Sequence, residues 1–168
     1  MGDMLKSIIA ILFGLSLLTA CGGGNSEAEG EPETNTETTA EVSNEATLSI
    51  NGNDQMQFDK KELTVKAGQT VTLTLHHTGT LAKAAMGHNW VLLKIGTDVA
   101  SFAEKAVAAG EANDYIPTEG DAVIAHTKLI GGGETATVEF TAPAAGSYEF
   151  ICSFPGHWSM MRGTLIVE

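Results

Sequence analysis

Three side chains with metal-binding chemistry lie close together near the C-terminal end of the sequence. Cys152, His157 and Met161 supply a thiolate, an imidazole and a thioether within one short stretch. Pro155 and Gly156 lie between them, and a turn at this dipeptide would let the three donors converge on one centre. Soft sulfur and nitrogen donors of this kind favour copper among the metals that proteins bind.

A second histidine is needed to complete such a site, and His88 in the segment Gly87-His88-Asn89-Trp90 supplies it. Two imidazoles and one thiolate in a plane, with a long bond to an axial methionine, are the donors of an electron-transfer copper site. Without His88, the Cys152–Met161 stretch would be an ordinary buried segment, because Cys and Met are common in protein cores. Zinc also accepts two histidines and a cysteine, but a methionine as fourth donor favours copper as the functional ion.

The remaining histidines, His76, His77 and His126, are not paired with further donors at ligand spacing. We therefore interpret them as structural or surface residues. Trp90 and the Met56–Met86 pair are likewise expected in the core or on the surface, not as ligands.

The elements that must position the donors are mostly strands. Residues 70–75 and 135–140 alternate polar and apolar side chains, and residues 148–152 and 163–167 are rich in β-branched or aromatic side chains. Turn-forming dipeptides separate these runs. Several short strands at this spacing predict an all-β protein, specifically an antiparallel β-sandwich.

One segment has helical periodicity instead. Apolar residues recur at the spacing of a single helix face after Thr97-Asp98, which is a possible N-terminal cap, and before Gly110; they are Val99, Phe102, Ala103, Ala106 and Val107. The pattern predicts one helix packed on the β-domain.

Charge is unevenly distributed along the 168 residues, whose net charge is -12. Residues 21–45 contain seven Glu and no basic residue, and residues 46–168 contain 13 acidic residues against 8 Lys and Arg. An acidic chain without a basic cluster repels a phosphate backbone, which excludes nucleic acid as a partner.

The N-terminal segment has the order of a secretory leader. Lys6 precedes the apolar run 8–18, and small residues precede Cys21. The sequence Leu18-Thr19-Ala20-Cys21 also resembles the lipobox of bacterial lipoproteins. We therefore expect residues 1–20 to be a lipoprotein signal peptide and Cys21 to carry a lipid that anchors the protein to a membrane. The alternative is a plain leader whose removal leaves a soluble protein.

Residues 21–45 consist almost entirely of Gly, Ser, Thr, Asn, Ala and Glu. Such a composition cannot bury enough apolar surface to offset the entropy of ordering. We expect a disordered acidic tether, followed by one folded domain over residues 46–168.

Four blocks of the folded segment resemble the type 1 copper proteins, the cupredoxins, and among them the azurin branch. The resemblance covers nearly all of residues 47–168, and the blocks are residues 51–58, 86–92, 123–131 and 152–165. It implies an eight-stranded Greek-key β-sandwich with a helical flap. It also implies one copper ion held by His88, Cys152 and His157, with weaker axial contacts from Met161 and the Gly87 carbonyl.

The resemblance further implies supporting roles around the metal. Asn89 is expected to tie the two ligand segments together, and Phe154 to lie beside them. His77 is expected to be a histidine near the copper that does not bind it. An apolar docking patch is expected where the ligand His157 reaches the surface, formed by Met56, Leu81, Ala85, Met86, Phe154, Pro155, Gly156, Trp158 and Met160.

Two positions depart from the family pattern. The family's usual disulfide has no counterpart, because Ala46 and the turn 66–69 lack its cysteines. Trp158 stands directly after the exposed ligand, where a small residue is common, and is expected to extend the docking patch or to alter partner choice.

The function that follows is a one-electron carrier of a periplasmic respiratory chain, cycling Cu(II) and Cu(I). Its expected partners are c-type cytochromes or a reductase in transient contact, and the chain is expected to be a monomer, lipid-anchored in the periplasm. Gly22 in place of an Asp after the lipidated cysteine favours the outer membrane. Copper capture or storage is the alternative. An enzyme is not expected, because the chain has one core cysteine and no His-x-His pair for further copper centres.

Overall fold

The computed structural model describes residues 43–168. The expected signal peptide and all but the last three residues of the expected tether lie outside the described residues, so these expectations remain predictions. None of the helices in the described part is both long and apolar enough to cross a membrane.

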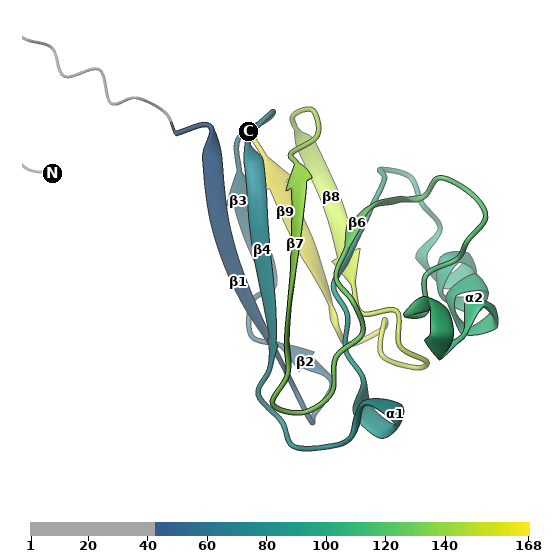
Figure 1. Ribbon diagram of the computed structural model, residues 1–168. Helices are drawn as coiled ribbons and strands as arrows, with labels where there is room; N and C mark the ends of the chain where they lie inside the picture. Colours follow the sequence, from purple (N-terminus) through teal and green to yellow (C-terminus); the bar gives the residue numbers. More distant parts are fainter. Residues whose placement is uncertain (1–42) are drawn as a thin grey trace, which may run out of the picture. The chain divides into compact units, whose positions relative to one another are not determined.

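In the described part of the chain, nine strands form two sheets that pack on a common core (Figure 1). The first sheet has the order β2 (Gln57–Phe58), β1 (Glu45–Asn53), β4 (Thr70–His77) and β7 (Thr135–Thr141). The second has the order β3 (Glu62–Val65), β9 (Arg162–Val167), β8 (Gly146–Ile151), β5 (Val91–Leu93) and β6 (Val123–His126). The expected β-sandwich is therefore confirmed, with one two-residue strand, β2, more than the eight strands implied by the resemblance.

The expectation of a purely antiparallel sandwich is wrong for two strand pairs. β1 and β4 run parallel along their length, from Glu45 opposite Thr70 to Gly52 opposite His77, and β3 and β9 are also parallel. After β1 the chain crosses to β3 in the other sheet and then returns to β4, so β4 can run beside β1 in the same direction. Alternation of side chains specifies which face of a strand is buried, but it carries no information about strand direction.

The core lies between the two sheets. In β4 the side chains of Val71, Leu73 and Leu75 are buried, as their alternation predicts. Trp90 is fully buried, with its ring centroid 5.8 Å from that of Phe140 and 5.7 Å from that of Phe150. The interpretation of Trp90 as a core residue is confirmed.

The predicted helix is α2 (Val99–Ala109), which packs on a second apolar cluster beside β5 and β8. The Asp98 carboxylate accepts a hydrogen bond from the Ser101 backbone N–H at 3.0 Å, which is an N-cap. Gly110 ends the helix with φ 75° and ψ 173°, a backbone conformation that favours glycine. The expectation for Val107 is wrong, because its side chain is 51% exposed: the helix buries only a narrow stripe against the sheet.

The start of the domain is held without a disulfide. Gln69 Nε2 donates to the Ser43 carbonyl at 2.7 Å, and the Thr70 N–H donates to the Asn44 carbonyl at 2.8 Å. Ala46 packs against the core. Hydrogen bonds and apolar contacts therefore hold this segment in place instead of a disulfide.

Candidate metal centre

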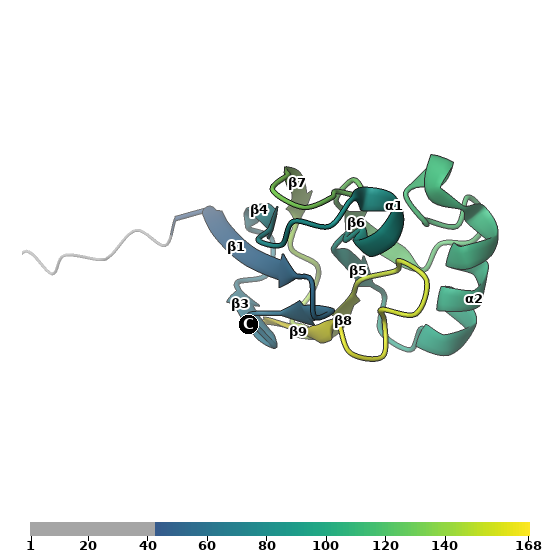
Figure 2. The same cartoon turned by 90° about the horizontal axis from the view of Figure 1, so that it is seen from below.

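The strand order explains why residues far apart in sequence meet at one end of the sandwich. His88 lies just before β5, and Cys152 directly follows β8. β5 and β8 are antiparallel neighbours, with Val91 opposite Ile151, so the start of one strand lies beside the end of the other. Figure 2 looks onto this end, where the short helix α1 (Lys83–Met86), α2 and the yellow loop between β8 and β9 are grouped.

His88, Cys152 and His157 form a compact donor set in the described part of the chain. Cys152 Sγ lies 3.9 Å from His88 Nδ1 and 3.7 Å from His157 Nδ1, and all three residues are buried. First-row metal bonds to thiolate and imidazole are about 2.3 and 2.0 Å long, so a trigonal arrangement separates sulfur from nitrogen by about 3.8 Å. The donor set therefore fits a single metal ion, and both sulfur–nitrogen distances match a trigonal arrangement.

The orientation of His88 is fixed by a main-chain carbonyl. His88 Nε2 donates to the Asn53 carbonyl oxygen at 2.9 Å, since a carbonyl can only accept. The proton is therefore on Nε2, and Nδ1 presents its lone pair toward Cys152. The sequence does not predict this role of Asn53, because residue type carries no information about what a backbone carbonyl binds. The family resemblance of residues 51–58 is the only indication that this segment belongs to the site.

His77 stacks on His88 and is not a ligand. The ring centroids are 4.2 Å apart, with an interplanar angle of 16°. His77 Nδ1 accepts from the Gly79 N–H at 3.1 Å and Nε2 donates to the Met86 carbonyl at 2.8 Å. Both ring nitrogens are thus engaged within the protein. His76 and His126 lie apart from the donor set, on β4 and at the end of β6.

The turn after β8 carries His157. Its N–H donates to the Phe154 carbonyl at 3.0 Å, and its carbonyl accepts from the Met161 N–H at 2.8 Å. Gly156, which lies in the turn between Phe154 and His157, has φ 81°, a conformation that favours glycine. The Phe154 ring lies against the His157 ring at a centroid distance of 4.6 Å.

Burial changes the pKa values of the three donors and thereby their protonation states. Desolvation lowers the pKa of His157 to about 4 and also lowers the pKa of His88, so both imidazoles are neutral at pH 7. Desolvation raises the pKa of the Cys152 thiol to about 12, partly offset by the backbone N–H groups of Asn89 and Phe154. Without a metal the thiol therefore keeps its proton, and a metal must displace it.

Asn89 joins the two ligand segments through its side chain. Its Oδ1 accepts from the Ser153 N–H at 2.8 Å, and its Nδ2 donates to Ser153 Oγ at 2.8 Å and to the Asp114 carbonyl at 2.7 Å. The residues adjoining His88 and Cys152 are therefore locked together.

Met161 and Gly87 lie at the same end of the domain. Met161 is fully buried, and the Gly87 carbonyl oxygen lies 3.9 Å from Cys152 Sγ. A Cβ atom on Gly87 would lie 2.6 Å from the Lys83 carbonyl oxygen, so only glycine fits this position. The axial roles expected for Met161 and Gly87 stay predictions.

Gly52 is a second close approach that the sequence did not reveal. A Cβ atom there would lie 2.8 Å from His88 Cδ2 and 3.3 Å from Met161 Cε. His88 and Met161 thus pack directly on the backbone of β1.

The expected docking patch is partly exposed. Leu81 is 44% exposed and Met160 is 48% exposed, Ala85 and Gly156 are exposed, and Phe154 is buried against His157. The remaining members are partly buried: Met56, Met86, Pro155 and Trp158. Trp158 also packs against the apolar cluster under α2, so it links the ligand loop to the helix.

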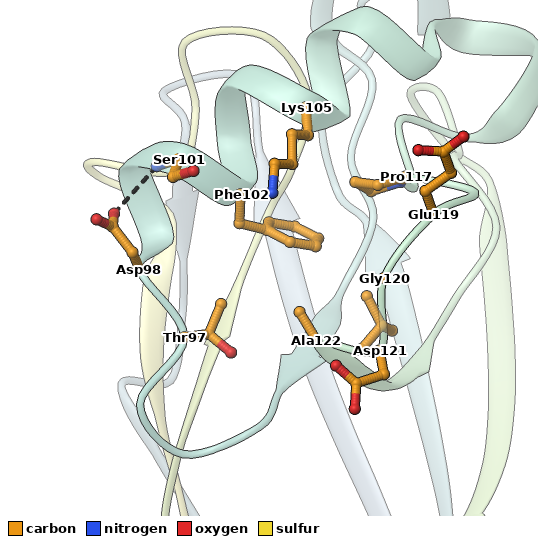
Figure 3. A pocket seen from close by; sticks show the side chains of 11 residues that line it. Thr97, Asp98, Ser101, Phe102, Lys105, Pro117, Glu119, Gly120, Asp121 and Ala122 are labelled. Atoms are coloured by element: carbon orange, nitrogen blue, oxygen red, sulfur yellow. Dashed lines mark hydrogen bonds between the residues drawn. The ribbon is translucent and has the colours of Figure 1, made fainter.

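The hollow of about 290 Å³ shown in Figure 3 lies elsewhere, between α2 and residues 117–123. Phe102 and Lys105 line it from the helix, and Glu119 and Asp121 from the facing loop. None of the metal donors lines this hollow. The candidate centre is a separate, buried cluster of donors.

Comparison with known proteins decides the family. The sequence profile of the copper binding proteins of the plastocyanin/azurin family matches residues 44–168. The chain belongs to this plastocyanin/azurin family. The expected cupredoxin fold and copper as the cofactor are thereby confirmed.

Two family relatives illustrate the similarity. Azurin-1 of Alcaligenes xylosoxydans xylosoxydans is 50% identical over 125 residues, which are 72% of this chain and 96% of the relative. Auracyanin-A of Chloroflexus aurantiacus is 38% identical over 164 residues, which are 96% of this chain and 95% of the relative.

Two solved structures of copper proteins are also similar to this chain. Auracyanin A, a "blue" copper protein from Chloroflexus aurantiacus, superposes with a TM-score of 0.68 at 41% identity, covering 74% of this chain and 99% of that one. The azurin Az-iso2 of Methylomonas sp. strain J gives a TM-score of 0.67 at 37% identity, covering 73% and 98%. The family and the donor set together support a copper electron-transfer protein. They favour an electron carrier over an enzyme.

Proposed function

We propose that the protein is a one-electron carrier of a bacterial periplasmic respiratory chain, with one copper ion held by His88, Cys152 and His157. A bound copper supplies a one-electron change between Cu(II) and Cu(I). The observation that carries the proposal is the donor set itself: two neutral imidazoles and one thiol, all buried, with the sulfur 3.9 and 3.7 Å from the two Nδ1 atoms, which is the sulfur–nitrogen spacing of a trigonal site.

The chain holds these donors in place before any metal arrives. His88 is fixed by the Asn53 carbonyl, and the Cys152 N–H donates to the Met161 carbonyl at 2.9 Å. Asn89 connects the residues beside both ligands. A carrier benefits from this rigidity, because little rearrangement between oxidation states means a small barrier to electron transfer.

The surface near His157 suits a brief encounter with a redox partner. Phe154 lies against the His157 ring, and the exposed side chains of Leu81 and Met160 are apolar. Small apolar patches of this kind support weak, transient contacts. The partners that we propose are c-type cytochromes or a reductase, met by a monomeric protein.

An anchor at Cys21 is compatible with such encounters. β1 runs nine residues from Glu45 to Asn53, whose carbonyl holds His88. At about 3.3 Å per residue, the chain enters the domain about 26 Å from the histidine ligand. We propose a lipoprotein, with the outer membrane favoured, whose copper end is free to meet partners in the periplasm.

Three measurements on the copper-loaded protein test the carrier against copper capture or storage. A carrier should show a reversible one-electron voltammetric wave and fast electron self-exchange, and should lose copper slowly to a chelator. Storage predicts the reverse: slow self-exchange and ready loss of copper. The anchor is tested separately, by a lipid-sized mass increase on Cys21 that a Cys21→Ser variant lacks.

A further inference from the structure

Left-handed backbone at residues with a Cβ atom is confined to two turns of the described chain. Met56 has φ 56°, and the consecutive residues Asp114 and Tyr115 both have φ 54°. Such conformations are unfavourable for residues other than glycine and persist where the surroundings impose them. Their positions therefore indicate where the fold tolerates strain.

Each of these turns presents carbonyl groups to the network around the candidate copper ligands. The Asn53 carbonyl, at the start of the Met56 turn, accepts from both the Met56 N–H at 3.2 Å and His88 Nε2 at 2.9 Å. The Asp114 carbonyl accepts from Asn89 Nδ2 at 2.7 Å, and the Tyr115 carbonyl accepts from Ser153 Oγ at 2.9 Å.

The Asp114–Tyr115 turn is itself tightly held beyond the end of α2. The Tyr115 N–H donates to the Gly110 carbonyl at 3.0 Å, and Asp114 Oδ1 accepts from the Leu129 N–H at 3.0 Å. Between these anchors, two successive left-handed residues direct both carbonyls to the ligand side. An extended or right-handed pair would direct at least one of them elsewhere.

From this turn a short chain of contacts reaches the thiol. Asn89 and Ser153 bond to each other as well as to the turn, and Ser153 directly follows Cys152. The Tyr115 ring meets the Phe154 ring edge-on at 5.3 Å, and Phe154 lies against His157 at 4.6 Å. Both sides of the ligand segment are thus supported from the same turn.

We infer that the left-handed pair Asp114–Tyr115 is a positioning element for the copper-thiolate centre, which fixes Asn89 and Ser153 and through them the placement of Cys152. The inference rests on the proposed function, because it concerns the same centre. It assigns a role to a segment that none of the ligand residues belongs to.

Substitutions that favour or disfavour the left-handed conformation test the inference. Asp114→Val disfavours it, because branching at Cβ is poorly tolerated there, whereas Asp114→Asn preserves both it and the acceptor for the Leu129 N–H. Tyr115→Val and Tyr115→Phe form a second pair. Val138→Ala, a partly buried position on β7, is the control for general destabilisation.

We expect both valine variants to release copper about 10-fold faster to a chelator and to shift the reduction potential and the copper EPR spectrum. In the metal-free protein, the Ser153 N–H should exchange faster with deuterium. Asp114→Asn, Tyr115→Phe and Val138→Ala should keep the wild-type rate of copper release, reduction potential, EPR spectrum and Ser153 N–H exchange rate.

Valine variants as stable as Val138→Ala, with wild-type potential, copper release and Ser153 exchange, would overturn the inference. If the valine variants do not fold, Asp114→Ala and Tyr115→Leu replace them with the same expected direction. Failure of the proposed function is distinct, because it would show in the wild-type protein as the absence of a reversible one-electron wave.

Discussion

His88 donates its Nε2 proton to the main-chain carbonyl of Asn53 at 2.9 Å, and this bond decides which ring nitrogen is free for a metal. Asn53 ends β1, the strand that begins the folded domain. The first strand therefore orients a ligand that lies 35 positions further along the chain. The candidate metal centre is built by the whole sandwich and not by the ligand loop alone.

Gly52→Ala should weaken copper binding. The added methyl would lie 2.8 Å from His88 Cδ2 and 3.3 Å from Met161 Cε, so at least one of these residues must move. We expect copper to dissociate about 10- to 100-fold faster, as for other changes that disturb ligand orientation. Chelator competition measures the rate.

Gly146→Ala is the matched control for that variant. Its new methyl would lie 3.1 Å from the tip of the exposed Ile95 side chain and in ordinary contact with the Tyr148 ring, at the opposite end of β8 from Cys152. Wild-type copper release in Gly52→Ala, or equal acceleration in both variants, would contradict the role assigned to Gly52.

Copper binding should release one proton. Burial raises the pKa of Cys152 to about 12, so the thiol is protonated at neutral pH, whereas the lowered pKa values of His88 and of His157, about 4, leave both imidazoles neutral. The apparent affinity for Cu(II) should therefore rise about tenfold per pH unit between about pH 6 and 9.

Titration of the metal-free protein with Cu(II) in weakly buffered solution counts the protons. One proton per copper is expected across this range, and Cys152→Ser should release none. Two or three protons would mean that the histidines are charged, and a wild-type value of zero would mean that the thiolate already exists without metal.

A charge on the proposed docking patch should slow electron exchange. Met160→Glu would place a carboxylate at the exposed end of the ligand loop, where two copies must approach for self-exchange. Repulsion between like charges should lower the self-exchange rate about tenfold at low salt, with partial recovery at high salt.

Ile95→Glu provides the comparison, because Ile95 is 64% exposed and lies beyond the opposite end of β5 from His88. Its self-exchange rate should stay near that of the wild type. A similar decrease in both variants would argue against an encounter through the Met160 surface.

Asp98→Ala should destabilise the domain without affecting the metal. The Asp98 carboxylate caps α2 through the Ser101 N–H, and loss of such a cap costs about 1 kcal/mol. Urea unfolding of the metal-free protein measures the change. Glu104→Ala, an exposed change within the same helix, should cost less than about 0.5 kcal/mol; a cost for Asp98→Ala no greater than this would refute the capping role.

The sequence predicted those features that depend on residue type and short-range pattern. The donors His88, Cys152 and His157 were found because their chemistry is rare and their spacing specific. Helix α2 is predicted by its apolar periodicity and by Asp98, whose carboxylate caps the first turn. Buried and exposed faces of β4 followed from alternation.

Features made by the backbone or by long-range pairing were not predictable in this way. The carbonyls of Asn53, Asp114 and Tyr115 act through the main chain, which residue type does not describe. The closeness of Gly52 to His88 depends on the packing of two distant segments. The parallel pairing of β1 with β4 arises from a crossover between sheets, which no local pattern encodes.

The absorption spectrum of the purified protein after addition of one equivalent of Cu(II), beside a Cys152→Ser variant, tests the central claim most directly. If His88, Cys152 and His157 converge on copper as described, the wild type should turn intensely blue and the variant should not. A colourless or pale wild-type protein, or a variant with the same colour, would contradict the account.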